Sequence, residues 1–161
     1  MPIILEMRFD LTPPTREQMR ALVAYLSADE RQLLLEHGEE APFCGIFLYE
    51  KRVGLYTCRL CGLPLFKAVA KFESGTGWPS FTAPFAQDHL RRIRDTRYGM
   101  VRKEIICSRC GAHQGHVFPD GPPPTGERFC INSGSLEFTP IGERLPDKLR
   151  RGAPEGEPIN S

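Results

Sequence analysis

The sequence predicts a mainly β protein with a short helical segment at its N-terminus. The chain has 161 residues, of which 15 are glycine and 15 are proline, and this composition is typical of many turns. Apolar residues make up 40% of the chain, which is enough for a hydrophobic core. From Ala41 onward they come in short runs that Gly and Pro separate, whereas the preceding residues have helical spacing. The length fits one domain with extensions at its ends.

Residues 1–40 are predicted to form a helical extension. Two stretches fit the capping box, in which side chains satisfy the free amides at the start of a helix: Thr15–Gln18 and Ser27–Glu30. Apolar residues recur at helical spacing on the first helix, namely Met19, Leu22, Val23 and Leu26. Gly38 is predicted to end the second helix. We expect both helices to pack against the neighbouring domain.

Residues 41–142 are predicted to form the main domain, and residues 143–161 a flexible tail. Four runs have the pattern of strands: Val101–Cys107, Gln114–Phe118, Arg128–Ile131 and Ser135–Phe138. The tail is rich in Pro, Gly and charge, which predicts a loosely held segment. A local basic run, Arg91–Arg94, is predicted to be a solvated face because the whole chain has no large positive excess.

Charge and hydropathy argue against two kinds of partner. The 21 Lys and Arg residues nearly balance the 20 Asp and Glu residues, and a net charge of +1 disfavours nucleic acid or an acidic membrane surface as partner. No run approaches the roughly 18 apolar residues that span a bilayer. Glu6 comes too early for the apolar region of a signal peptide. We therefore expect a cytoplasmic protein with no nucleic-acid or membrane partner, and a monomer.

Two Cys-x-x-Cys-Gly turns predict a structural zinc site. Each turn places two thiolates where they can reach one metal ion, and the following Gly can adopt the positive φ that the turn needs. The four sulfurs complete tetrahedral coordination, with no open position for catalysis, and come from Cys58, Cys61, Cys107 and Cys110. A redox pair and two structural disulfides are the competing interpretations. A redox pair usually begins a helix in a βαβ unit, and no such pattern flanks these turns.

Cys130 lies in one of the predicted strands. Alternation along the strand points Phe129 and Ile131 toward the core. The opposite face then carries Arg128, Cys130 and Asn132. A nearby guanidinium favours the thiolate, so Cys130 fits an activated nucleophile. A buried, inert cysteine beside a surface arginine explains the same residues equally well.

His113 and His116 are candidate proton carriers near neutral pH. They are also candidate metal ligands, although the four cysteines already complete a site. Positions three apart on a regular strand face opposite ways, so joint action needs a bend at Gly115.

Trp78 is the only tryptophan and lies in the loop Gly75–Phe81, among Gly and Pro residues. An aromatic side chain on such a loop suits a small apolar pocket, and a cap on the core is an equal alternative. The loop lacks the Lys-Ser/Thr pair of a phosphate-binding loop, so we reject that function.

Together these motifs resemble the B-type methionine sulfoxide reductases, which act on the R epimer of the sulfoxide. The resemblance covers roughly residues 41–140 and is carried by the two cysteine turns and by Ser74–Phe81, His113–Gly121 and Arg128–Ser133. It implies two antiparallel sheets around the active site, with a structural zinc away from it. It also implies exposed methionine (R)-sulfoxide, in oxidised proteins or free, as substrate and thioredoxin as reductant.

The resemblance further implies a role for each site residue. Cys130 is implied to attack the sulfoxide sulfur and to become a sulfenic acid as methionine leaves. Polar contacts around the reacting oxygen, water or proton are implied for His113, His116 and Asn132. A pocket for the sulfur-bound methyl is implied for Trp78 and Phe118, and charged support for Arg128 and Asp120.

The chain departs from the family at two positions. Many members carry a resolving cysteine where this chain has Thr76, and most have an apolar residue in place of Gln114. The second departure concerns only local packing. Cys44 is the cysteine that the other assignments leave over. We hypothesise that it resolves the sulfenic acid as a Cys44–Cys130 disulfide, which thioredoxin reduces. The alternative is a bystander Cys44, with a reductant acting directly on Cys130.

Two other functions are alternatives that would also involve the four zinc cysteines. A zinc-stabilised binding module explains the four cysteines equally well, but not the convergence of Cys130, Trp78 and the histidines. A zinc hydrolase needs an open coordination position, which a four-thiolate site does not offer.

Overall fold

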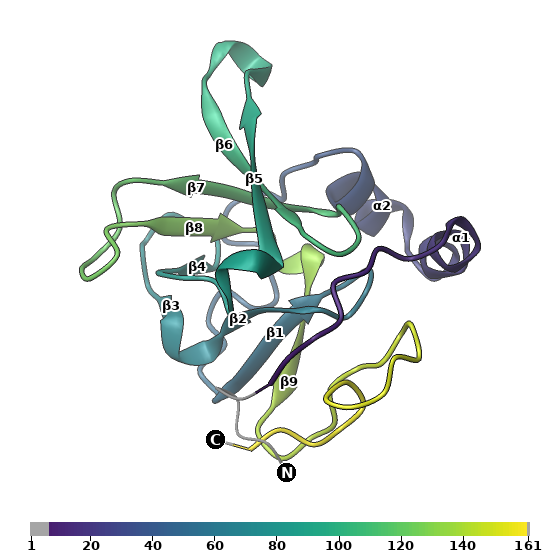
Figure 1. Ribbon diagram of the computed structural model, residues 1–161. Coiled ribbons are helices and arrows are strands. Elements are labelled where there is room, and N and C mark those ends of the chain that lie inside the picture. The colour runs from purple at the N-terminus through teal and green to yellow at the C-terminus, as the bar shows by residue number, and fades with distance from the viewer. Residues whose placement is uncertain (1–6, 161) are drawn as a thin grey trace.

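The computed structural model describes residues 7–160, and most of its regular structure is β-strand. The strands are β1 (Gly54–Cys58), β2 (Pro64–Lys67), β3 (Lys71–Phe72), β4 (Ser80–Phe81), β5 (Leu90–Asp95), β6 (Arg102–Cys107), β7 (His113–Phe118), β8 (Arg128–Ile131) and β9 (Leu136–Pro140). They form a three-stranded sheet, β2-β1-β9, and a six-stranded sheet, β3-β4-β8-β7-β6-β5 (Figure 1). Every pairing is antiparallel, so the predicted fold class is confirmed.

Two helices precede the sheets, α1 (Arg16–Ala24) and α2 (Ala28–Leu35). Both predicted capping boxes are present: the side chains of Thr15 and Ser27 each accept from the amide three residues later, at 3.1 Å. The end of α2 differs from the prediction. The left-handed residue is His37, with φ 57°, and Gly38 follows it and donates its N–H to the Gln32 carbonyl at 2.9 Å.

The helices share one hydrophobic core with both sheets. Leu22, Leu26 and Leu34 belong to the same buried cluster as Phe66 and Ile105 of the strands. The packing expected for the helices is therefore present, and the core continues across the boundary that we placed at residue 40. None of the helices described is long and apolar enough to cross a membrane. The first six residues, including Glu6, lie outside the described part of the chain.

The expectation of a loosely held tail is corrected for residues 143–160. Leu145, Leu149 and Ile159 are buried, and Glu155 forms a buried ion pair with Arg109. In Figure 1 the segment folds back beside β9. Its composition of Pro, Gly and charge misled the prediction because three spaced apolar residues are enough to anchor it, and its turns satisfy its backbone.

The basic run forms β5, the edge strand of the larger sheet. Arg91, Arg92 and Arg94 are exposed, as predicted, but the strand ends on Asp95, which is buried. The four predicted strands correspond to β6, β7, β8 and β9, with ends that differ by at most two residues, and β5 was not predicted as a strand. The hairpin of β5 and β6 rises away from β7 and β8 (Figure 1).

Candidate active site

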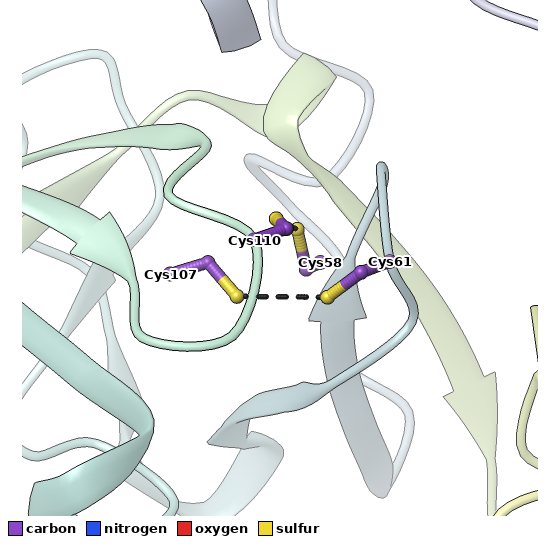
Figure 2. Close-up of side chains that lie close together, drawn as sticks. All are labelled: Cys58, Cys61, Cys107 and Cys110. Carbon is purple, nitrogen blue, oxygen red and sulfur yellow. Dashed lines mark hydrogen bonds between the residues drawn. The ribbon is translucent and has the colours of Figure 1, made fainter. Parts of the chain in front are cut away.

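The four paired cysteines meet between the two sheets. One turn connects β1 to β2 and the other connects β6 to β7, and their side chains point toward one another (Figure 2). The Sγ atoms of Cys58 and Cys110 are 3.6 Å apart, as are those of Cys61 and Cys107, and all four lie within 4.8 Å of one another. Tetrahedral zinc with Zn–S bonds of about 2.3 Å separates its sulfurs by about 3.8 Å. The arrangement therefore fits a metal site of the zinc type.

The two turns have the same backbone geometry. Gly62 and Gly111 have φ of 85° and 79°, and each donates its N–H to the carbonyl of the first cysteine at 2.8 Å. The positive φ predicted for these glycines is confirmed. Two buried side chains also donate to the sulfurs: Arg109 Nε to Cys61 at 3.4 Å and Gln114 Nε2 to Cys58 at 3.5 Å. Gln114, the departure from the family, thus donates a hydrogen bond to a cysteine sulfur.

Cys130 lines a cavity of about 180 Å³ on one face of the larger sheet. In β8, Phe129 and Ile131 are buried, whereas Arg128 and Cys130 are partly open. This is the predicted alternation. The cavity lining consists of Glu39, Thr76, Trp78, Arg102, Gly115, His116, Phe118, Arg128, Cys130 and Asn132. Its volume is below the 300–1,000 Å³ typical of whole small ligands, so it suits a single side chain.

Six of the nine predicted catalytic and substrate-binding residues therefore line one cavity. The three that do not line it, within the described chain, are Cys44, His113 and Asp120. Cys44 is exposed, and it and Cys130 are both free thiols. His113 is fully buried behind His116, and Asp120 is a surface residue that binds Arg128.

An irregularity in β7 brings the two histidines together. β6 pairs Ile105 with Gly115 and the next residue, Ile106, with His113, so one residue of β7 is inserted. The imidazole centroids of His113 and His116 are consequently 5.6 Å apart. The bend expected at Gly115 is thus present. A Cβ on Gly115 would lie 2.0 Å from the Cys130 carbonyl oxygen, so only glycine fits there.

Each histidine is held by a carboxylate that the sequence did not reveal. His116 Nε2 lies 2.8 Å from Asp95 Oδ2, and His113 Nδ1 lies 2.5 Å from Glu104 Oε2. His37 also bonds to the Glu104 carboxylate. Burial lowers the pKa of both His113 and His116, and their carboxylate partners act against that shift. Both imidazoles are therefore neutral at pH 7.

The sequence contains only weak signals for the histidine partners Asp95 and Glu104. Glu104 is the one acidic residue in a strand that ends in apolar residues, and Asp95 closes a basic run. Neither feature specifies a histidine partner, because that depends on strand register. Arg102 and Glu39, which also line the cavity, form an ion pair at 2.6 Å. They lie 63 residues apart, so nothing local in the sequence connects them.

Asn132 fastens the segment before Cys44 to the site. Its Nδ2 donates to the Gly38 carbonyl at 2.9 Å, and its Oδ1 accepts from the Glu40 amide at 3.1 Å. The Glu40 carboxylate in turn accepts from the amides of Ser133 and Gly134. Asn132 lines the cavity, but both ends of its amide already have backbone partners.

Trp78 is oriented by the same segment. Its Nε1 donates to the Glu40 carbonyl at 2.9 Å. Gly77, with φ 97°, lies against Pro42 and Phe43, and a Cβ there would be 2.7 Å from the proline ring. The Phe43 amide donates to the Gly77 carbonyl at 2.7 Å. Residues just before Cys44 therefore support the aromatic wall of the cavity.

The thiol of Cys130 is not activated in the way we predicted. Burial raises its pKa to about 11, and the Arg128 guanidinium lowers the pKa but does not outweigh burial. Arg128 is also engaged with Asp120, at 3.0 and 3.2 Å, and lies over the Phe118 ring. Cys130 is therefore a thiol at rest.

Comparison with known proteins gives the class that this fold and site define. Residues 26–140 match the SelR domain, and the chain belongs to that family, the B-type methionine sulfoxide reductases. A Caulobacter vibrioides (strain NA1000 / CB15N) protein is 65% identical over 144 residues, covering 89% of this chain and 91% of its own. A Xylella fastidiosa (strain M23) protein is 59% identical over 148 residues, covering 92% and 96%. Both bear the name peptide methionine sulfoxide reductase MsrB, and the resemblance drawn from the motifs is confirmed.

Proposed function

We propose that the protein reduces methionine (R)-S-oxide, in proteins or free, to methionine. The observation that carries this proposal is the convergence of Cys130, His116 and Trp78 on a cavity the size of one side chain, in a chain of the SelR family. Trp78 and Phe118 would enclose the methyl and methylene groups of the substrate. The sulfoxide oxygen would then lie on the polar side, near His116.

The reaction follows from the protonation state of Cys130. Its sulfur attacks the sulfoxide sulfur while the thiol proton, directly or through neutral His116, reaches the sulfoxide oxygen. Cleavage of the substrate S–O bond transfers the hydroxyl to Cys130. Methionine leaves, and a sulfenic acid remains on the enzyme. Arg128 stabilises negative charge on the Cys130 sulfur during attack, and Asp120 holds Arg128 in place.

His113 and Asn132 hold other parts of the site in place, and of the two only Asn132 lines the cavity. His113 is fixed by Glu104 and lies behind His116. Asn132 holds the backbone of Gly38 and Glu40, which positions Trp78. Both roles are positional, and both keep the cavity in shape.

Cys44 is the proposed resolving cysteine. Its thiol attacks the sulfenic sulfur of Cys130, a disulfide forms and water leaves. The chain is anchored near Cys130 on both sides of Cys44, because the Glu40 amide binds Asn132 and the Phe47 amide donates to Ser133 Oγ at 3.2 Å. Three extended residues span about 10 Å, so a movement of residues 41–46 that breaks the Phe43–Gly77 hydrogen bond would carry Cys44 toward Cys130.

Thioredoxin is the proposed reductant of this disulfide. Cys44 is exposed, which gives a dithiol protein access to its sulfur. Zinc is the proposed metal of the four-cysteine site, where it would hold the two turns together and leave the chemistry to Cys130. A monomeric state and a cytoplasmic location remain predictions from the sequence.

Turnover of chirally resolved methionine sulfoxide with dithiothreitol tests the activity. We expect consumption of the R epimer only, and loss of at least about a thousandfold in kcat for Cys130→Ser. The Cys44→Ser variant is the matched control and should keep its activity, because dithiothreitol can reduce the sulfenic acid itself. Activity that survives Cys130→Ser would refute the nucleophile, and S-epimer turnover would refute the substrate.

Mass spectrometry after one turnover with thiols blocked tests the resolving role. We expect a Cys44–Cys130 link in the wild type and loss of thioredoxin-dependent turnover in Cys44→Ser. Thr76 lines the cavity, so Cys44→Ser/Thr76→Cys should restore a disulfide and turnover. Oxidised Cys130 without a link to Cys44, together with full thioredoxin-dependent activity of Cys44→Ser, would contradict the proposal.

A further inference from the structure

A second cavity, of about 620 Å³, adjoins the active one. It lies between the β5–β6 hairpin and the end of β7, and Arg102 and Phe118 line both cavities. The pairing of β6 with β7 ends at Lys103 and Val117, so the next residue on each strand marks the point where the strands separate. The cavity that contains Cys130, here called the active cavity, has room for one side chain. The rest of a longer substrate would extend through the second cavity.

The second cavity carries uncompensated positive charge. Arg94 and Lys103 line it and lie directly opposite each other on β5 and β6. Neither forms an ion pair within residues 7–160. Glu127, the one carboxylate in the lining, binds Arg92 at 2.9 Å, and nearby Lys103 helps to lower its pKa. Like charges in a directly opposed pair destabilise a sheet. Repulsion between the two side chains therefore destabilises this part of the sheet, and an anionic ligand would relieve it. This concentration of positive charge is local, because the net charge of the whole chain is only +1.

The same cavity offers apolar contacts. Ile93 and Val101 line it and are 41% and 71% exposed, and Val117 and Pro119 complete this part of the wall. A small anion has no use for such a surface, whereas a polypeptide with acidic and apolar side chains matches both of its features. Because β5 is the edge strand of the sheet, its outer backbone groups are also open to an extended segment.

We infer that this cavity, the docking groove, binds acidic residues that flank methionine sulfoxide in an oxidised polypeptide. The inference rests on the proposed function, since the methionine sulfoxide side chain itself occupies the active cavity. Arg94 and Lys103 attract the flanking carboxylates, and Ile93 and Val101 contact neighbouring apolar side chains. The groove thus selects among protein substrates by the sequence around the oxidised methionine.

Two peptides with one methionine (R)-sulfoxide test the groove, one flanked by Glu residues and the other by Gln. For the wild type we expect kcat/KM about tenfold higher with the Glu peptide, since each exposed ion pair contributes up to about fivefold. Arg94→Gln/Lys103→Gln should reduce this preference below about twofold and leave turnover of N-acetyl-methionine (R)-sulfoxide unchanged. High salt should weaken the wild-type preference. Equal rates for the two peptides in the wild type would overturn the inference.

Arg91→Gln is the matched control. Arg91 is exposed on the same strand and lines neither cavity, so its loss should preserve the preference. If no substrate is reduced at all, the proposed function is wrong, and a binding measurement then tests the docking groove separately. Fluorescence anisotropy of a labelled Glu peptide with unoxidised methionine should then show binding that the double variant loses. Absence of binding, or tighter binding of single-stranded nucleic acid than of the peptide, would refute the groove.

Discussion

Cys130 shows how burial and charge compete at a single side chain. The sequence placed it beside Arg128 on the open face of a strand, and that placement is confirmed. The direction of the guanidinium's effect was also predicted, but burial is the larger influence and raises the pKa to about 11. The thiol form of Cys130 therefore predominates at pH 7. In the proposed reaction, this thiol proton is the one that reaches the substrate oxygen.

Alkylation of Cys130 should depend steeply on pH. Because the thiolate is the reactive form, the rate with iodoacetamide should rise about tenfold per pH unit between pH 7 and pH 10. Timed labelling with mass spectrometry of the Cys130 peptide measures this rate apart from Cys44. Arg128→Met should slow labelling further, because the guanidinium lowers the pKa of the thiol. A plateau below pH 8 would contradict the raised pKa.

β7 is the element on which the site depends most. Its inserted residue turns two histidines, three positions apart, toward one another, and its pairing with β8 places His116 opposite Cys130. Gly115 makes this possible because the β8 backbone passes where a side chain would begin. The irregularity of β7 therefore also positions the proposed catalytic residues His116 and Cys130.

Gly115→Ala should destabilise the protein by about 3 kcal/mol, because the new methyl group overlaps the Cys130 carbonyl oxygen. Denaturant unfolding measures the loss. Gly99→Ala is the control: it also has a left-handed backbone, with φ 69°, but no atom lies within 4 Å of the added Cβ. It should cost about 1 kcal/mol. Equal losses for the two variants would show that backbone strain, and not the clash, dominates.

The elements that could be predicted are those whose signals are local. Capping boxes, cysteine turns and strand alternation each depend on residues within a few positions, and all are confirmed. Asp95, Glu104 and His37 could not be found, because their roles arise from strand register and from a helix end far along the chain. Cys130, Trp78 and the two histidines were already candidates from local patterns. Only the family resemblance assigned them to one site, because it carries tertiary information that spacing lacks.

At the scale of the whole molecule, Arg109 connects the cysteine cluster to both ends of the chain. It is 1% exposed, donates to the Asp10 carbonyl at 3.2 Å, and forms two hydrogen bonds to the Glu155 carboxylate, at 2.7 and 3.0 Å. It also donates to the Cys61 carbonyl at 2.8 Å. The metal turns and the terminal segments are therefore expected to lose stability together.

Arg109→Met should lower the free energy of unfolding by about 3–5 kcal/mol, because it leaves Glu155 buried without a cation. Burial already raises the pKa of Glu155, and Arg109 opposes that shift. Arg109→Met/Glu155→Leu should recover at least about 2 kcal/mol, since no unpaired charge remains. Thermal unfolding of both variants with zinc present gives the comparison. Equal stability of the single and double variants would contradict this account.

The two anchors around Cys44 have a kinetic consequence. Residues 41–46 form a short tether between Glu40 and Phe47, whose amides bond to Asn132 and Ser133, two and three positions after Cys130. A tether of this length gives the Cys44 thiol an effective concentration of at least the order of millimolar near the sulfenic acid. Free thiols and peroxide in solution must compete with that local supply. In the proposed reaction, the short tether would therefore protect the oxidised sulfur of Cys130 from a second, irreversible oxidation, even though the Cys44 thiol lies outside the cavity.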